Sequence, residues 1–239
     1  MKYKRQIIYA LIMLIAAVAI VLIIANFGGT KTDASGMYND QIITERIANG
    51  EVKTDPSVSG LTAVSVDTIS GIYVEDGSDE VLDNILTLTI SNDSDVMLQY
   101  AKLILSIGDE EYLFEISSIP AGETVRAMEM NRKPLTSAEG DIVLNQEYIA
   151  WTYDNLTMCE SVFNVVQREN AIIVENISGE TVNAPLYVYY KNYVDGIYIG
   201  GITYRAGTME NIEPGETVVL SAKHFDPEVS QLLFVTYVP

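Results

Sequence analysis

The hydrophobic pattern of this chain changes character twice along its length. Residues 7–25 form an unbroken apolar run without a charge, and residues 27–63 are mostly polar and rich in Gly, Ser, Thr, Asp and Asn. From about residue 64 onward, apolar and polar positions alternate with a period of two, which is typical of β-strands with one buried face. The pattern predicts a membrane-length helix, a linker and an all-β region, in that order.

The apolar run predicts a transmembrane signal anchor over residues 7–26. As a helix, its 19 uncharged residues would span about 28 Å, close to the thickness of the hydrocarbon core. Three of the first five residues are basic, whereas the 15 residues after the anchor contain one basic residue, Lys31. Basic flanks stay in the cytoplasm, so we expect residues 1–6 to be a cytoplasmic tail and the rest to be extracytoplasmic. The alternative is a signal peptide that is cleaved near residues 28–35.

The linker, residues 27–63, contains a candidate short helix. Asn39 or Asp40 could cap its start, and Asn49-Gly50 could end it. Its narrow apolar face consists of three isoleucines, at positions 42, 43 and 47. Two interpretations stay open, a marginal helix within a spacer and a helix that docks on a partner.

Several runs of β-branched and aromatic residues after the linker have the length of strands. They include residues 86–90, 100–107, 187–190 and 232–238. Turn-forming residues such as Asp-Gly and Pro-Gly pairs separate the runs. Short strands with turns roughly every 8–12 residues predict an antiparallel sandwich or barrel.

The all-β region contains an internal repeat. Three pairs of anchors follow one another in the same order, and two of the pairs have the same offset of 84 residues. The anchors are an Asn-x-Ser turn (Asn92 and Asn176), an Ile-x-x-Gly-Glu-Thr-Val turn (Ile119–Val125 and Ile212–Val218) and a Thr-Tyr pair (Thr152-Tyr153 and Thr236-Tyr237). Two modules over residues 64–155 and 158–239, each with the size of a seven-stranded sandwich, account for the repeat. Both Asn-x-Ser sequences are also glycosylation sequons, but we interpret their asparagines as turn residues.

The motifs of the second copy follow a characteristic order. They are the Asn176 turn, the aromatic strand Leu186–Tyr190, the Asp195-Gly196 hairpin and the Ile212–Val218 turn. This order resembles bacterial immunoglobulin-like modules of the FxLYD and CARDB-like kind, and the resemblance covers about two thirds of the chain. The first copy departs from it by having Gly108–Glu111 in place of the Asp-Gly hairpin. The resemblance implies two tandem immunoglobulin-like antiparallel β-sandwiches of the cell-surface accessory type, with no catalytic residue to carry over.

Composition narrows the possible functions. The 14 Lys and Arg residues against 33 Asp and Glu give a net charge of −19, which would repel a nucleic-acid backbone. One Cys and one His exclude a disulfide framework, a Cys/His zinc site and most catalytic triads. Nothing in the sequence brings Cys159 and His224 together, so Cys159 is expected to be a small buried residue or a partner in an intermolecular disulfide. We therefore expect no enzyme activity and no small-molecule substrate.

The acidic cluster in the first copy is the one candidate cation site, because several oxygens on a flexible loop suit Ca²⁺. Its candidate ligands are Asp76, Asp79, Glu80 and Asp83. The EF-hand spacing is absent, and a solvated acidic loop is the alternative. Otherwise the sequence predicts no cofactor.

Tyrosines crowd the second copy around its predicted central hairpin. Neighbouring residues of a strand point to opposite faces, so some of these rings must lie outside the core. We single out Tyr189, Tyr198 and Tyr204, which flank Gly200-Gly201, as a possible partner-binding surface. The alternative is ordinary core filling and cross-strand packing.

These features lead to a functional expectation. The chain is expected to be a single-pass membrane protein that presents tandem immunoglobulin-like modules to an envelope protein or a cell-wall polymer. The alternative is an accessory subunit of a membrane secretion, pilus or transport assembly.

Overall fold

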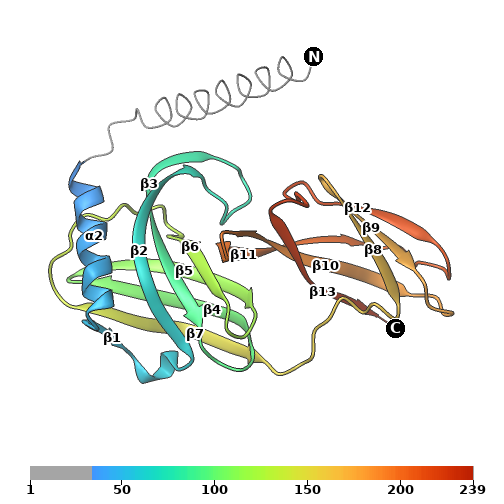
Figure 1. Cartoon of the computed structure of the whole chain (residues 1–239), viewed down its shortest axis with the longest axis horizontal. Coiled ribbons are helices and arrows are strands. Elements are labelled where there is room, and N and C mark those ends of the chain that lie inside the picture. The colour runs from blue at the N-terminus through green and yellow to red at the C-terminus, as the bar shows by residue number, and fades with distance from the viewer. Residues whose placement is uncertain (1–33, 239) are drawn as a thin grey trace, which may run out of the picture. The chain divides into compact units, whose positions relative to one another are not determined.

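The chain is built almost entirely of β-strands over the residues that the structure describes (Figure 1). In this computed structural model the backbone is described for residues 34–238 and the side chains for residues 41–238. A helix, α2 (Ala34–Ala48), and a 3₁₀ helix, η1 (Pro56–Val58), lie on either side of the first strand. The strands are β1 (Val52–Thr54), β2 (Leu61–Ile72), β3 (Val81–Asn92), β4 (Met97–Ile107), β5 (Glu110–Ile119), β6 (Thr124–Met128), β7 (Ile142–Thr152), β8 (Phe163–Arg168), β9 (Ala171–Asn176), β10 (Asn183–Val194), β11 (Ile197–Thr208), β12 (Thr217–Ser221) and β13 (Ser230–Val238).

The predicted membrane segment precedes the part of the chain that the structure describes. The predicted tail, residues 1–6, and the predicted anchor, residues 7–26, both lie outside the described residues. Within residues 34–238 there is no helix with the length and hydrophobicity of a membrane span.

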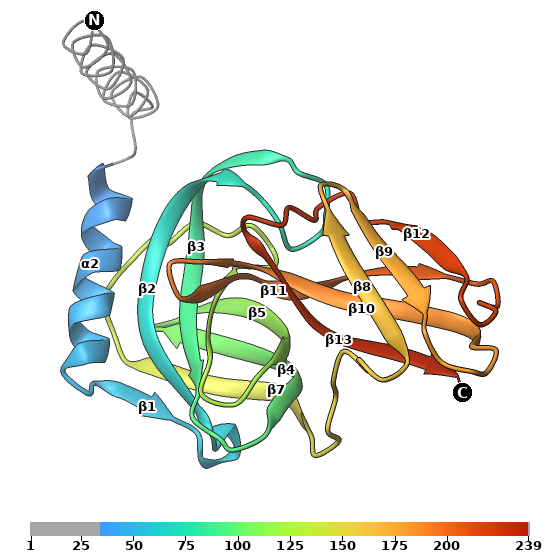
Figure 2. The same ribbon diagram turned by 45° about the vertical axis from the view of Figure 1, so that its right-hand side comes forward.

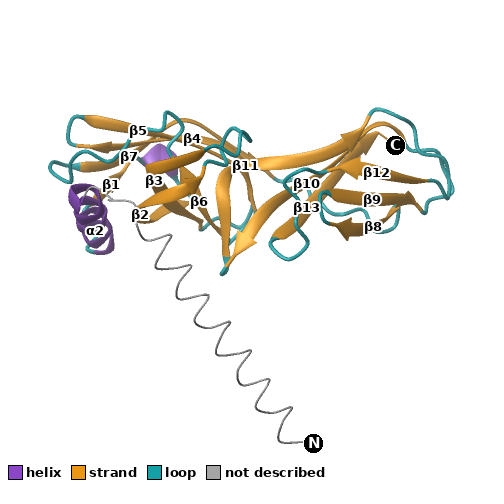
Figure 3. Cartoon of the chain, turned by 90° about the horizontal axis from the view of Figure 1, so that it is seen from above, coloured by secondary structure: helices purple, strands orange, loops and turns teal. Residues whose placement is uncertain are grey.

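Three sheets pack in a sandwich-like arrangement around two main apolar cores. Their strand orders are β1-β7-β4-β5, β13-β10-β11-β6-β3-β2 and β12-β9-β8. The predicted all-β fold class is thus confirmed as a mostly β, sandwich-like structure. Figure 3 shows the six-stranded sheet passing from one group of strands to the other through β11.

The sequence repeat corresponds to a repeat of topology. We name strands β2–β7 the first copy and strands β8–β13 the second copy. In each copy the first, second and fifth strands lie side by side, as β2-β3-β6 within the six-stranded sheet and as β8-β9-β12 in the three-stranded sheet. The third, fourth and sixth strands pair as β7-β4-β5 and β13-β10-β11. Every strand of the first copy therefore has a counterpart in the second.

The two asparagine anchors of the repeat make the same hydrogen bonds. The side chains of Asn92 and Asn176 are fully buried. Each donates from its amide to the carbonyl four residues later and to the isoleucine carbonyl that opens the Gly-Glu-Thr-Val turn, at 2.8–3.0 Å. The N–H groups of Gly122 and Gly215, both at positive φ, donate back to the carbonyls of these asparagines at 2.8 Å. Burial and bonding together favour the turn role over glycan attachment.

The Thr-Tyr anchors differ in their packing. Tyr153 follows the end of β7 and is 82% exposed. Tyr237 lies within β13, where its ring meets Phe163 edge-on at 5.1 Å between centroids. At this anchor the two copies therefore differ both in the extent of the last strand and in the environment of the tyrosine.

The later part of the predicted linker belongs to the fold instead of forming a spacer. Ile43 and Val58 are fully buried and Ile47 is 8% exposed, all within the core of the first copy. Helix α2 ends with two backbone bonds, from Gly50 N to Ile47 O and from Glu51 N to Arg46 O, both 2.9 Å. These bonds form a glycine-dependent helix end, as the sequence predicts. The isoleucine face of α2 therefore packs into the first copy of its own chain, which differs from both a free spacer helix and a helix that docks on a partner.

Candidate functional site

The hairpin that carries the candidate tyrosines has the predicted turn. Asp195 and Gly196 have φ values of 52° and 83°, and Val194 pairs with Ile197 across the turn. Positive φ at both central positions is the requirement of a type I′ turn, which glycine meets without strain. The turn aligns β10 with β11 and so positions the strand that reaches the first copy.

The Gly200-Gly201 pair permits a close backbone approach, and the first copy makes that approach. A Cβ on Gly201 would lie 1.8 Å from the carbonyl oxygen of Glu115 in β5. A Cβ on Gly200 would lie 2.6 Å from Val74 Cγ2. Strand β11 also pairs in parallel with β6, with Tyr198 opposite Val125. We call this region, where β11 meets β5, β6 and the β2–β3 loop, the junction.

The three candidate tyrosines make their contacts within the chain. Tyr198 is 1% exposed and therefore has almost no surface to offer a partner. Tyr204 is half-buried and stacks on His224, with 4.8 Å between ring centroids. Tyr189 is also half-buried and stacks on Phe234 at 4.6 Å. These positions favour core filling and cross-strand packing, and we do not carry these residues forward as a binding surface.

A buried carboxylate, Glu75, and a buried ammonium, Lys191, bond to the same two residues of β11 at the junction and were not anticipated from the sequence. The carboxylate of Glu75, which is 4% exposed, accepts bonds from the N–H groups of Met128 (2.7 Å), Gly201 (2.8 Å) and Ile202 (3.1 Å). Lys191 is fully buried and donates from Nζ to the carbonyls of the same two residues of β11, at 2.8 and 2.5 Å. Burial raises the pKa of Glu75 and lowers the pKa of Lys191 to about 7, although the charge of Glu75 opposes the second shift. The Glu75 carboxylate ties the β2–β3 loop of the first copy to β11 of the second copy.

The lowered pKa of Lys191 predicts a pH-dependent stability. The ordinary pKa of lysine is 10.5, so above about pH 7 the folded state binds fewer protons than the unfolded chain. The free energy of unfolding should therefore rise by about 2 kcal/mol between about pH 7 and pH 9. Urea unfolding at both pH values should show this rise for the natural chain and lose it for Lys191→Met. The exposed change Lys223→Met should keep it, and a rise that persists in Lys191→Met would contradict the assignment.

The acidic cluster predicted as a cation site is engaged with basic side chains. Arg132 binds both Asp76 and Glu80, at 2.7 and 2.8 Å. Asp79 pairs with Lys223 at 2.7 Å and faces the imidazole of the single histidine at 3.2 Å. Among the side chains of residues 41–238, no group of three or more His, Cys, Asp or Glu could hold a metal ion. The Asp79 contacts instead join the β2–β3 loop to the segment between β12 and β13.

Cys159 and His224 have separate surroundings. Cys159 is half-buried before β8, and its Sγ lies 3.7 Å from the carbonyl oxygen of Thr157. His224 stacks on Tyr204 and faces Asp79. Neither residue serves as a partner of the other in these contacts.

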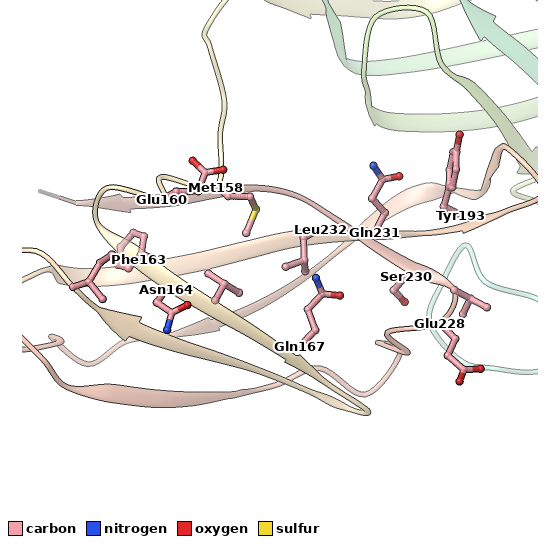
Figure 4. Close-up of a pocket in the computed structure, with 13 residues that line it drawn as sticks. Met158, Glu160, Phe163, Asn164, Gln167, Tyr193, Glu228, Ser230, Gln231 and Leu232 are labelled. Atoms are coloured by element: carbon pink, nitrogen blue, oxygen red, sulfur yellow. The ribbon is translucent and has the colours of Figure 1, made fainter.

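The second copy carries an open groove of about 960 Å³ between the edge strands β8 and β13. Figure 4 shows side chains of both strands and of the segments beside them around this space. Phe163 and Val165 of β8 and Leu232 of β13 contribute apolar surface. Two exposed carboxylates, Glu160 and Glu228, also line it. We call this space the β8–β13 groove.

Comparison with known proteins adds no family to this picture. No protein-family model matches the sequence, and no curated protein is significantly similar to it.

Proposed function

We propose that this protein is a membrane-anchored extracytoplasmic binding or structural protein whose tandem immunoglobulin-like sandwiches present the β8–β13 groove to an envelope protein or a cell-wall polymer. The groove is the observation that carries the proposal. It combines apolar walls with amide and carboxylate groups, and such a mixture suits recognition by contact more than catalysis. The net charge of −19 argues against a nucleic acid as the partner.

The strand order supports the immunoglobulin-like part of the proposal. Immunoglobulin-type sandwiches pair their first, second and fifth strands in one sheet and place the third strand beside the sixth in the other. Both copies have this order, in β2-β3-β6 with β7-β4 and in β8-β9-β12 with β13-β10. The apolar run over residues 7–25 and its basic flank support the membrane anchor.

The junction supports a presenting role. Hydrogen bonds from Ser117 and Thr203 join the copies besides the Glu75 contacts, since the two hydroxyls lie 2.9 Å apart and Thr203 donates to the Ser117 carbonyl at 3.0 Å. Because these backbone and side-chain hydrogen bonds hold the second copy to the first, the second copy would face its partner in one orientation. Such a fixed orientation lowers the entropy cost of binding.

The second candidate is an accessory subunit of a membrane assembly, bound through a helix near the membrane. This role would be favoured by an exposed apolar helix face. In α2, however, Ile43 and Ile47 are buried in the first copy. We therefore place binding at the β8–β13 groove ahead of the accessory role.

Site-specific photo-crosslinking in intact cells that make the full chain tests the proposal. A crosslinker at Gln167, which is exposed and lines the groove, should yield a covalent adduct with an envelope component. The matched control is a crosslinker at Val219 of β12, which is 68% exposed and lies outside the groove lining. Equal adducts at both positions, or none at Gln167, would contradict binding at the groove.

A further inference from the structure

The repeat provides an internal comparison for the β8–β13 groove. Its counterpart in the first copy is the space between β2, an end strand, and β7, which corresponds to β13. There, β1 adds to β7 as a parallel strand, with Val52 opposite Ile142. Helix α2 covers the β2 side, where the hydroxyl of Thr44 donates to Val66 O at 2.5 Å and accepts from Val66 N at 3.1 Å. Figure 2 shows α2 beside β2 and β1 beside β7. The chain thus fills the groove of its first copy with its own residues 41–58.

The second copy lacks such a cover among the described residues. Only residues 153–162 connect β7 to β8, and their one backbone bond to β13 runs from Val235 N to Thr157 O at 2.9 Å. Strand β13 is the end strand of its sheet, and β8 is the end strand of the facing sheet. An end strand exposes unpaired N–H and C=O groups that accept another strand. The same architecture is therefore closed in one copy and open in the other.

The charge of the groove restricts what can fill it. Glu160 and Glu228 line the groove, and the residues around it include no lysine or arginine. Neither carboxylate takes part in the ion pairs found among residues 41–238. Positive charges at the edges of a segment and apolar side chains at its centre would both increase its affinity for the groove.

We propose that the β8–β13 groove binds a segment of a partner protein that pairs with β13 as an added strand, inserts apolar side chains between β8 and β13, and carries Lys or Arg opposite Glu160 and Glu228. This inference rests on the proposed function and specifies its partner. The occupant reproduces in the second copy what β1 and α2 do in the first. Alternation of apolar and basic residues gives a strand one face for the groove and one for the carboxylates and solvent.

Binding of a model peptide to the full chain in mild detergent tests this partner chemistry. The probe is a fluorescent peptide of about ten alternating Val and Lys residues, a length typical of long strands. We expect it to bind and to slow hydrogen exchange at the backbone amides of residues 230–234. A peptide with the same composition in separate Val and Lys blocks, and one of alternating Val and Glu, should each bind at least about tenfold more weakly.

Charge reversal locates the binding. The double variant Glu160→Lys/Glu228→Lys should weaken binding of the Val-Lys peptide at least about tenfold. The matched control Glu180→Lys/Glu210→Lys makes the same change in net charge at exposed positions outside the groove lining and should retain most of the affinity. Equal losses in the two variants, or binding without protection of β13, would overturn the proposal.

Two further outcomes separate this inference from the proposed function. Protection of β13 by soluble cell-wall fragments and not by the peptide would overturn the protein partner while leaving a binding role for the groove. Protection of β13 that depends on protein concentration without any peptide would identify another molecule of this protein as the occupant. That result would also overturn the proposal of a partner protein.

Discussion

Replacement of Gly201 by alanine is expected to destabilise the protein by about 3 kcal/mol, the upper range for overpacking a close-packed site. The added Cβ would lie 1.8 Å from the backbone oxygen of Glu115 and 3.3 Å from the Cβ of Ala127. A backbone atom in the middle of β5 cannot move aside as the end of a side chain could. The strands must separate instead, and the bonds that join the copies are lost with them. Urea unfolding of the full chain, followed by the fluorescence of the single tryptophan, Trp151, measures the effect.

Gly179 provides the matched control for this substitution. A Cβ at Gly179 would meet no atom within 4 Å, and this glycine does not have a positive φ. The Gly179→Ala variant should therefore differ little from the natural chain. Similar stability of the two variants would show that the close approach at Gly201 does not hold the copies together.

Replacement of Glu75 by alanine is expected to cost about 3 kcal/mol as well, because it leaves buried N–H groups without an acceptor. Met128, Gly201 and Ile202 all donate to the Glu75 carboxylate. The change also removes the negative charge that partly offsets the burial of Lys191. The free energy of unfolding, again from urea titration of the full chain, should show the loss.

Two variants test the cause of that loss. Glu75→Gln keeps an acceptor oxygen for the backbone donors and should cost less than Glu75→Ala. Glu169→Ala removes an exposed carboxylate in the second copy and should change stability by about 0.5 kcal/mol or less. Equal stability of Glu75→Ala and Glu169→Ala would contradict a structural role for the buried carboxylate.

Local chemistry made much of the fold predictable. The period-two pattern identified strands such as residues 100–107, which lie in β4, because one side of each strand is buried. Turn chemistry identified the Asp195-Gly196 hairpin and the two asparagine anchors, because each depends on residues only a few positions apart or on a positive φ. These signals arise within short segments, so they can be recognised from one sequence.

The junction and the groove depend on long-range geometry that a sequence pattern does not carry. Glu75 meets Gly201 across 126 residues, and no periodicity links the two positions. The tyrosines were predicted to flank the Gly-Gly pair as a surface for a partner, but the segment that approaches this pair belongs to the first copy. The β8–β13 groove exists because no strand within residues 34–238 pairs with the outer side of β13, and no sequence motif marks the lack of such a strand.

The junction also limits how many modules can be joined in a row. It requires a long loop between the first two strands of the first copy. Residues 73–80 form this loop between β2 and β3, and the loop contains Glu75. In the second copy the corresponding connection is a two-residue turn, with Arg168 paired to Ala171. A turn of that length has no room for a buried carboxylate that reaches a following module. The second copy therefore could not hold a following module through this kind of contact, and its outer strands are left for other contacts.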